Sequence, residues 1–195
     1  MIVFDLDIDE IEYAYRVDGP YDPENGLIFD KKNILLDPYA RAVAGQRRWG
    51  KGKVGAYHAR VVKDIFDWGD MPQPKRELCD LIIYELHVRG FTQHASSGVK
   101  HPGTFAGLRE KIPYLKELGV NAVELMPIFE FDELANAREV DGKKLLDYWG
   151  YNSVGFFAPN TSYASGDSRN HEGWELKELI KDLHENGIEV ILDVV

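Results

Sequence analysis

Residues 103–128, GTFAGLREKIPYLKELGVNAVELMPI, contain a helix pattern that leads directly into the pattern of a buried strand. Between 105 and 118, apolar residues recur at steps of three and four, the period of a helix with one buried face. Residues 120–126 are almost continuously apolar and stop at Pro127, as in a strand covered on both faces. The stretch predicts a helix that returns the chain to a parallel sheet.

The predicted helix has a signal at each end and a break inside it. Thr104 is placed to cap the first turn, and Gly119 suits the left-handed position after the last turn. Pro113 lacks an N–H and crowds the preceding turn. We therefore expect the helix to kink or divide at this proline.

The same alternation continues on both sides of this stretch. Residues 81–86 form an earlier apolar run, and residues 188–195 form a later one. A second helix is expected from about 172 to 186. Its buried stripe consists of Leu176, Leu179, Ile180 and Leu183. The order strand, helix, strand, helix, strand predicts an α/β fold with parallel strands and right-handed crossovers.

A long insert, residues 128–170, follows the second predicted strand. Sites in α/β proteins are built at this end of parallel strands. The insert carries many aromatic side chains: Phe129, Phe131, Tyr148, Trp149, Tyr151, Phe156, Phe157 and Tyr163. Because aromatic residues favour burial, we expect most of them to pack and the rest to serve a ligand.

The first third of the chain predicts β-structure instead. Apolar residues alternate with polar ones at 11–17, the pattern of a half-buried strand. Two prolines and a glycine between 67 and 76 mark a boundary. We therefore expect a β-rich domain at 1–70, a linker at 71–79, and an α/β domain at 80–195.

Composition excludes several classes of protein. The 195 residues have a formal net charge of −10, which disfavours a nucleic-acid partner. Cys79 is the single cysteine, so no intrachain disulfide forms. The first ten residues do not resemble a signal peptide, and no stretch has the roughly 18 apolar residues of a membrane span. We expect a cytoplasmic protein without a membrane partner.

Few residues outside the insert suggest chemistry. Glu85 and His87 lie two apart on a predicted strand, a spacing open to acid/base chemistry or metal binding, although buried polar contacts suit Glu85 better. Glu124, within an apolar strand, needs a polar neighbour. The six histidines lack ligand spacing, so no metal site is expected.

Four strings together resemble the first part of the catalytic barrel of the α-amylase superfamily, glycoside hydrolase family 13. They are YELHVRGFT (84–92), GTFAGLREKIPYLKELGVNAVELMPI (103–128), DYWGYNSVGFFAPNTSYAS (147–165) and ELKELIKDLHENGIEVILDVV (175–195). Upstream, YAYRVDGPYDPENGLIFDKKNILLDPYARAV (13–43) is similar to the end of the β-sandwich of isoamylase and glycogen-debranching enzymes.

This resemblance implies an N-terminal fragment. Its fold would be a partial TIM (β/α)8 barrel, the first three strands, preceded by part of an all-β carbohydrate-binding sandwich. The implied activity is retaining hydrolysis of α-1,6-glucosidic branch linkages in glycogen or amylopectin, without a metal or cofactor. The partner would be an α-glucan. A branching enzyme, a pullulanase, a trehalose-releasing hydrolase and a non-catalytic glucan-binding fragment also fit the resemblance.

The resemblance also assigns site residues. In the family, the nucleophile and the acid/base follow strands four and five, so we expect no catalytic residue within this chain and no activity from it alone. Tyr151 matches a tyrosine that stacks on a sugar ring; otherwise it is a core tyrosine. Asp193 matches an active-site carboxylate; otherwise it caps a turn. Trp149 contacts glucan or wedges the insert.

Overall fold

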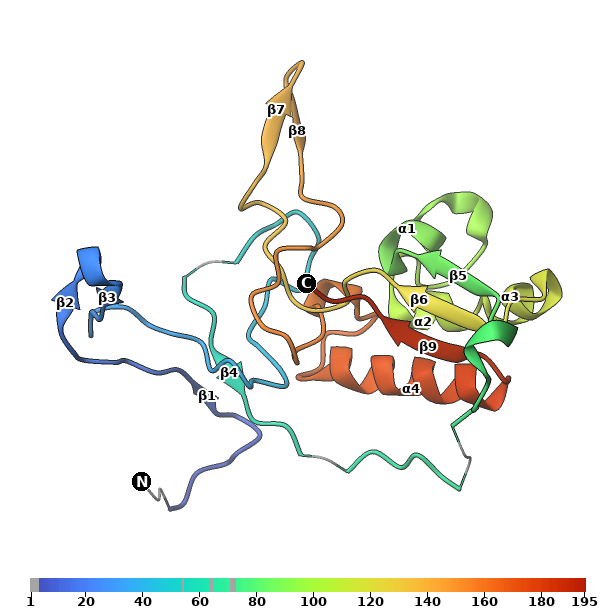
Figure 1. Cartoon of the computed structure of the whole chain (residues 1–195), viewed down its shortest axis with the longest axis horizontal. Coiled ribbons are helices and arrows are strands. Elements are labelled where there is room, and N and C mark those ends of the chain that lie inside the picture. The colour runs from blue at the N-terminus through green and yellow to red at the C-terminus, as the bar shows by residue number, and fades with distance from the viewer. Residues whose placement is uncertain (1–3, 54, 64, 71–72) are drawn as a thin grey trace.

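The α/β part of the computed structural model is built on a parallel sheet with the strand order β5–β6–β9 (Figure 1). The strands are β5 (Ile83–Leu86), β6 (Ala122–Leu125) and β9 (Glu189–Leu192). The three predicted apolar runs are thus confirmed as neighbours in one α/β sheet. The structure describes residues 4–53, 55–63, 65–70 and 73–195.

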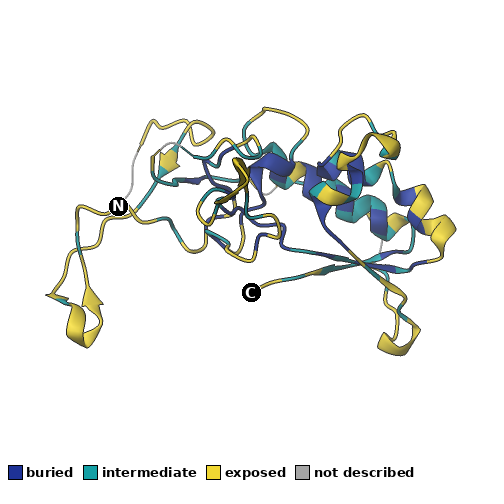
Figure 2. Ribbon diagram, turned by 90° about the horizontal axis from the view of Figure 1, so that it is seen from above, coloured by how far each residue is buried: buried dark blue, intermediate teal, exposed yellow. Residues whose placement is uncertain are grey.

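Helices cover one face of this sheet, as Figure 2 shows. They are α1 (Val88–Gln93), α2 (Phe105–Arg109), α3 (Ile112–Leu118) and α4 (His171–Glu185). The core between the two layers includes Leu86, Phe105, Leu115, Val123, Leu125 and Leu179. Because the opposite face has no helix over it, Ile83 is 47% exposed. One face of the sheet is therefore open.

The helix ends follow the predicted signals. The hydroxyl of Thr104 accepts a hydrogen bond from the Gly107 N–H at 3.1 Å, and Gly119 ends α3 with φ 84°. The predicted division is also confirmed. It falls before Pro113, which lies in the first turn of α3, where a missing N–H removes no helical hydrogen bond.

The N-terminal strands are short. β1 (Glu12–Tyr13) pairs with β4 (Ala59–Arg60), and β2 (Tyr21–Asp22) pairs with β3 (Leu27–Ile28). Short 3-10 turns occur at η1 (Pro23–Asn25), η2 (Leu78–Asp80), η3 (Ala95–Ser97) and η4 (Thr161–Tyr163). The strand expected at 11–17 is longer than the one observed. The sandwich and the domain division stay predictions; Met71 and Pro72 of the linker lie outside the described residues.

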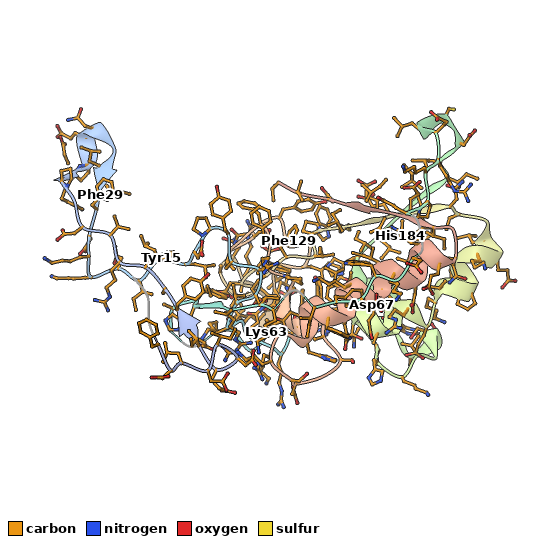
Figure 3. The ribbon with its side chains drawn as sticks, turned by 90° about the horizontal axis from the view of Figure 1, so that it is seen from below. Tyr15, Phe29, Lys63, Asp67, Phe129 and His184 are labelled. Carbon is orange, nitrogen blue, oxygen red and sulfur yellow. The ribbon has the colours of Figure 1, made fainter. Side chains whose placement is uncertain are left out.

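The N-terminal part nevertheless contacts the α/β part at several points. Val43 and Ala59 pack with Ala158 of the insert in a small apolar cluster. Farther along the chain, the Lys181 ammonium of α4 donates a hydrogen bond to the Asp67 carbonyl at 3.0 Å, and Figure 3 shows Asp67 over this helix. None of the helices in the described part of the chain is long and apolar enough to span a membrane.

The insert contains an antiparallel hairpin that the sequence interpretation missed. β7 (Arg138–Val140) pairs with β8 (Lys143–Leu145), and every residue of both strands is exposed. Asp141 and Gly142 join them with φ 50° and 71°, as a two-residue hairpin turn requires. In Figure 1 this β7–β8 hairpin projects away from the sheet.

The insert aromatics pack to different degrees, and some partly exposed ones still stack on another ring, as Tyr148 does on His87. Phe129, Phe131 and Tyr163 are buried, whereas five others are 39% to 62% exposed. The exposed five are Tyr148, Trp149, Tyr151, Phe156 and Phe157. The insert therefore buries three of its aromatic side chains and leaves the other five partly exposed.

Candidate functional site

The open face of the sheet carries three carboxylates. Glu85 and Glu124 are register neighbours on β5 and β6. Asp193 follows β9, and its N–H donates to the Leu125 carbonyl at 3.0 Å. Since side chains alternate between faces, these residues face away from the helices. Glu85 is exposed, so the expectation that it makes buried contacts is wrong for this structure.

Tyr151 reaches across to this face from the insert. Its hydroxyl donates a hydrogen bond of 2.5 Å to Asp193 Oδ2. This bond, followed by burial and the negative charges of Asp193, Glu85 and Glu124, raises the pKa of Tyr151 to about 12. The phenol is therefore neutral at physiological pH and acts as a donor. Two of the three predicted site residues, 42 positions apart, are thus in direct contact.

Trp149 lies beside this pair. Its indole is 62% exposed and meets the Tyr151 ring edge-on, with 6.3 Å between ring centroids. Both side chains line a groove of about 780 Å³ that also includes Arg138, Asp147 and Asn152. Two aromatic rings at the mouth of a groove suit the apolar C–H faces of a sugar.

His87 holds the segment that leads into Trp149. Its Nε2 lies 2.7 Å from the Tyr148 carbonyl, which can only accept, so Nε2 carries the proton. Nδ1 then accepts from the Gly90 N–H at 3.0 Å and caps α1. Burial lowers the pKa of His87, and the ring stacks on Tyr148 with centroids 4.2 Å apart. His87 is a neutral positioning residue, because both of its ring nitrogens are engaged by backbone groups.

Trp49 joins the N-terminal part to the same cluster. Its ring stacks on Tyr163 at 6.2 Å and meets Phe131 and Tyr148 edge-on. The Arg89 guanidinium lies 4.8 Å from the Trp49 ring centroid, a cation–π distance. The exposed site therefore rests on a packed aromatic layer. No local sequence signal connects position 49 with the insert, and the sequence interpretation missed this residue.

Two buried carboxylates brace the start of the insert. Glu130 accepts hydrogen bonds from the Thr161 N–H at 2.6 Å and the Gln46 N–H at 3.1 Å. Glu133 accepts from the Ser162 hydroxyl at 3.4 Å. Burial raises the pKa of each carboxyl to about 7, although the donors act in the opposite direction. These side chains bind the 45–47 segment to the insert below the site.

The raised pKa values predict how stability depends on pH. In the unfolded chain both carboxyls titrate near their ordinary pKa of about 4.3. Between that pH and about 7, the folded chain holds protons that the unfolded chain has lost, so the free energy of unfolding falls as pH rises. Urea unfolding from pH 5 to 8 should show a shallower slope in Glu130→Gln and Glu133→Gln than in the wild type.

Exposed Glu139 of β7 gives the matched control for this titration. Glu139→Gln removes a carboxylate from an exposed strand position, and we expect it to keep the wild-type slope. If the free energy of unfolding depends equally on pH in the wild type and in all three variants, Glu130 and Glu133 are not protonated in the folded chain.

Gly150, between Trp149 and Tyr151, has φ 84°, and a Cβ there would lie 2.7 Å from the Phe131 ring. Gly150→Ala should lower the free energy of unfolding by about 2–3 kcal/mol, since backbone strain and the clash add. Gly142 in the hairpin has φ 71° but nothing within 4 Å, so Gly142→Ala should cost about 1 kcal/mol. Urea unfolding compares the two; equal losses would mean that the Phe131 contact is unimportant.

Comparison with known proteins places these features in a family. The chain is 45% identical to isoamylase 1, chloroplastic, of Arabidopsis thaliana over 97% of its length, and covers 26% of that protein. It is 37% identical to a glycogen debranching enzyme of Yersinia enterocolitica, covering 94% of the chain and 30% of the relative. The chain thus spans about a quarter of the length of the curated relatives that it matches.

A solved structure is also similar to this chain. Pullulanase type I from Bacillus subtilis, complexed with maltose, matches 86% of the chain and 24% of its own length, with 32% identity and a TM-score of 0.65. The protein-family model described as "Alpha amylase, catalytic domain" matches residues 82–195. Because that match covers more than half of the chain, the chain belongs to the alpha-amylase catalytic-domain family.

Proposed function

We propose that this chain forms the amino-terminal part of a retaining α-1,6-glucosidase of the isoamylase or glycogen-debranching type. The contact between Tyr151 and Asp193 carries the proposal, because it joins an aromatic platform to a carboxylate at the carboxyl ends of parallel strands. The names of the relatives, isoamylase and glycogen debranching enzyme, support the linkage. In this proposal the sheet is the first three strands of a (β/α)8 barrel, and residues 1–70 belong to a β-sandwich.

Tyr151 and Trp149 have separate roles in binding the glucan. The Tyr151 ring stacks on the sugar beside the scissile bond, and its hydroxyl orients Asp193. Trp149 extends the apolar surface to a neighbouring sugar. The nucleophile and the general acid/base, which a retaining mechanism needs about 5 Å apart, come from outside residues 1–195. The location is cytoplasmic in this proposal, although the plant relatives are named chloroplastic.

Product analysis tests the reaction. The protein that carries this chain with a complete barrel is incubated with amylopectin, glycogen and pullulan. Release of linear maltodextrins from amylopectin and glycogen, with little cleavage of pullulan, is expected. Rapid pullulan cleavage would favour a pullulanase, consistent with the structural relative. New branches would favour a branching enzyme, and release of trehalose would favour a trehalose-releasing hydrolase.

The 195-residue chain has its own test. Its migration in a native gel containing glycogen should be retarded, because Tyr151 and Trp149 are already in place. Assay of reducing ends should show no cleavage. Retardation by the chain, with no hydrolysis by the barrel-containing protein, would favour a non-catalytic glucan-binding protein over the enzyme.

A further inference from the structure

Trp49 connects the N-terminal part of the chain to the segment that carries the two exposed site aromatics, Trp149 and Tyr151. Its partly buried ring meets the Tyr148 ring edge-on, with 6.0 Å between the centroids. His87 holds the same tyrosine from the α/β part, by a ring stack at 4.2 Å and a hydrogen bond to its carbonyl. Tyr148, which directly precedes Trp149, is therefore held by one ring from each part of the chain.

A second contact of Trp49 leads to Gly150. The Trp49 ring meets the Phe131 ring edge-on, with centroids 5.8 Å apart. Phe131 in turn lies so close to Gly150 that a Cβ at this glycine would be 2.7 Å from the ring. Because Gly150 directly follows Trp149, Trp49 supports the backbone on both sides of this tryptophan.

The Trp49 ring is itself fixed by the α/β part. The Arg89 guanidinium lies 4.8 Å from its centroid, and the buried Tyr163 ring stacks on it at 6.2 Å. The next residue, Gly50, has φ 72°, and a Cβ there would lie 2.9 Å from the Leu146 side chain. The ring is thus in place before any ligand binds, and a support that is ordered in advance reduces the entropy lost on binding.

We propose that Trp49 is a positioning residue, which keeps the 148–151 segment in the arrangement that binds the sugar and thereby sets the affinity of the site. The choice of a glucan as ligand rests on the proposed function. Trp49 is not among the described residues that line the groove, so it acts through Tyr148 and Phe131. Without its ring, the segment samples other arrangements, and the apparent affinity falls with the fraction that stays competent. Bound glucan orders the segment again, so the rate at saturation is retained.

The kinetic test uses the barrel-containing protein as wild type, Trp49→Ala and Trp49→Phe. We expect Trp49→Ala to raise KM for release of linear chains from glycogen about 10-fold, while kcat stays within about twofold of the wild type. A variant that merely folds less well would show a lower kcat at an unchanged KM, because fewer molecules are active. Trp49→Phe keeps a ring at this position, so its KM should rise only about threefold.

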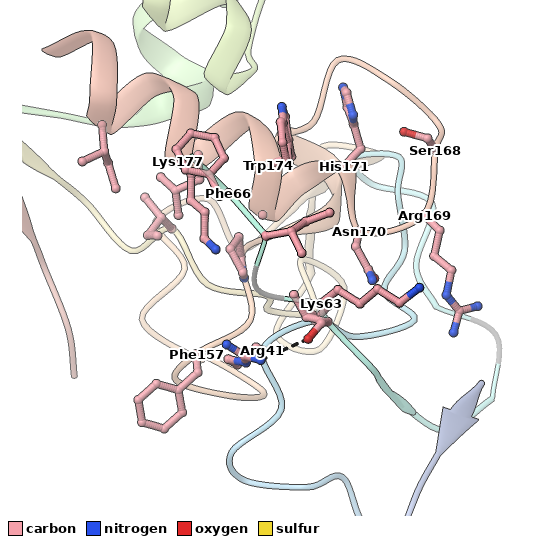
Figure 4. Close-up of a pocket in the computed structure, with 18 of the residues that line it drawn as sticks. Arg41, Lys63, Phe66, Phe157, Ser168, Arg169, Asn170, His171, Trp174 and Lys177 are labelled. Atoms are coloured by element: carbon pink, nitrogen blue, oxygen red, sulfur yellow. Dashed lines mark hydrogen bonds between the residues drawn. The ribbon is translucent and has the colours of Figure 1, made fainter. Parts of the chain in front are cut away.

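Tyr39→Ala is the matched control. Tyr39 also joins the N-terminal part to the insert by a ring stack, on Phe157, with centroids 5.9 Å apart. Phe157 lines a separate cavity of about 910 Å³, and Figure 4 shows its ring extending away from α4. Because this stack is made outside the 148–151 segment, Tyr39→Ala should keep the wild-type KM and kcat.

Hydrogen exchange of the protein without substrate tests the positioning directly. Asp147 and Val154 flank the 148–151 segment, and their N–H groups donate to backbone carbonyls at the start of the insert, at 2.9 and 2.8 Å. Trp49→Ala should speed amide exchange in the peptide 146–154 about 10-fold, because loss of the ring favours local opening. Tyr39→Ala should leave this exchange at the wild-type rate.

The proposal is overturned by wild-type exchange or a wild-type KM in folded Trp49→Ala, or by an equal rise of KM in Tyr39→Ala. If urea unfolding shows that Trp49→Ala does not fold, Trp49→Phe carries both measurements under the same criteria. Faster exchange in Trp49→Ala, with no release of linear chains by the wild type, would refute the proposed function and leave the positioning role standing.

Discussion

Tyr151→Ala should lower kcat/KM for release of linear chains from glycogen by about 100- to 1,000-fold in the barrel-containing protein, because misplacement of a reacting group by about 1 Å already costs about 100-fold. The substitution removes the stacking ring and also the 2.5 Å hydrogen bond to Asp193. Folding should be unaffected, since the side chain is 39% exposed. Reducing-end assays and urea unfolding measure the two effects separately.

Tyr151→Phe separates the ring from the hydroxyl. It keeps the stacking surface and loses only the bond to Asp193, so we expect a smaller loss of about 10-fold, the usual scale for one hydrogen bond to a charged group. Phe156→Ala, another exposed insert aromatic, should retain the wild-type rate. A Tyr151→Ala rate within about twofold of wild type would show that the stacking role is misassigned.

Phe105→Ala should lower the free energy of unfolding by about 3–5 kcal/mol, the usual cost of removing a fully buried aromatic ring. Phe105 is 0% exposed at the start of α2. Its ring meets Tyr163 edge-on with centroids 5.8 Å apart, and Tyr163 stacks on Trp49. The cavity left behind therefore lies directly below the aromatic layer that supports the site.

Tyr114→Ala is the matched control for Phe105→Ala. Tyr114 is an aromatic residue on α3 that is 47% exposed, so its loss should cost less than about 1 kcal/mol. Urea denaturation of both variants measures the difference. Similar losses would mean that the layer above α2 is loosely packed and closes around the gap.

The α/β core could be predicted from sequence because its signals are local. The apolar runs, the helical period, the Thr104 cap and the break at Pro113 each involve residues within a few positions of one another. The strand expected at 11–17 is longer than the one observed. Alternation of apolar and polar residues shows that a segment suits an extended backbone, but it does not show whether another strand pairs with it. Between residues 14 and 17, one isolated β-bridge joins Tyr15 to Leu35, and Tyr15 is 49% exposed.

The site was predictable only in part. The family resemblance assigned Tyr151 and Asp193 to one site, and the structure adds their direct contact across 42 positions. The support beneath it depends on longer separations, such as Gln46 to Glu130 across 84 positions. Periodicity carries no information at that range, so Trp49, Glu130 and Glu133 gave no signal. The Asp141-Gly142 turn did give one, since this pair favours a two-residue hairpin.

The β7–β8 hairpin allows this surface to diversify. All six of its strand residues are exposed, and its base continues into the wall of the groove beside Trp149. Exposed loop tips accept insertions and deletions at little energetic cost. Evolution can therefore lengthen or shorten this projection without disturbing the buried layer. Relatives that share the same core could in this way acquire different substrate ranges.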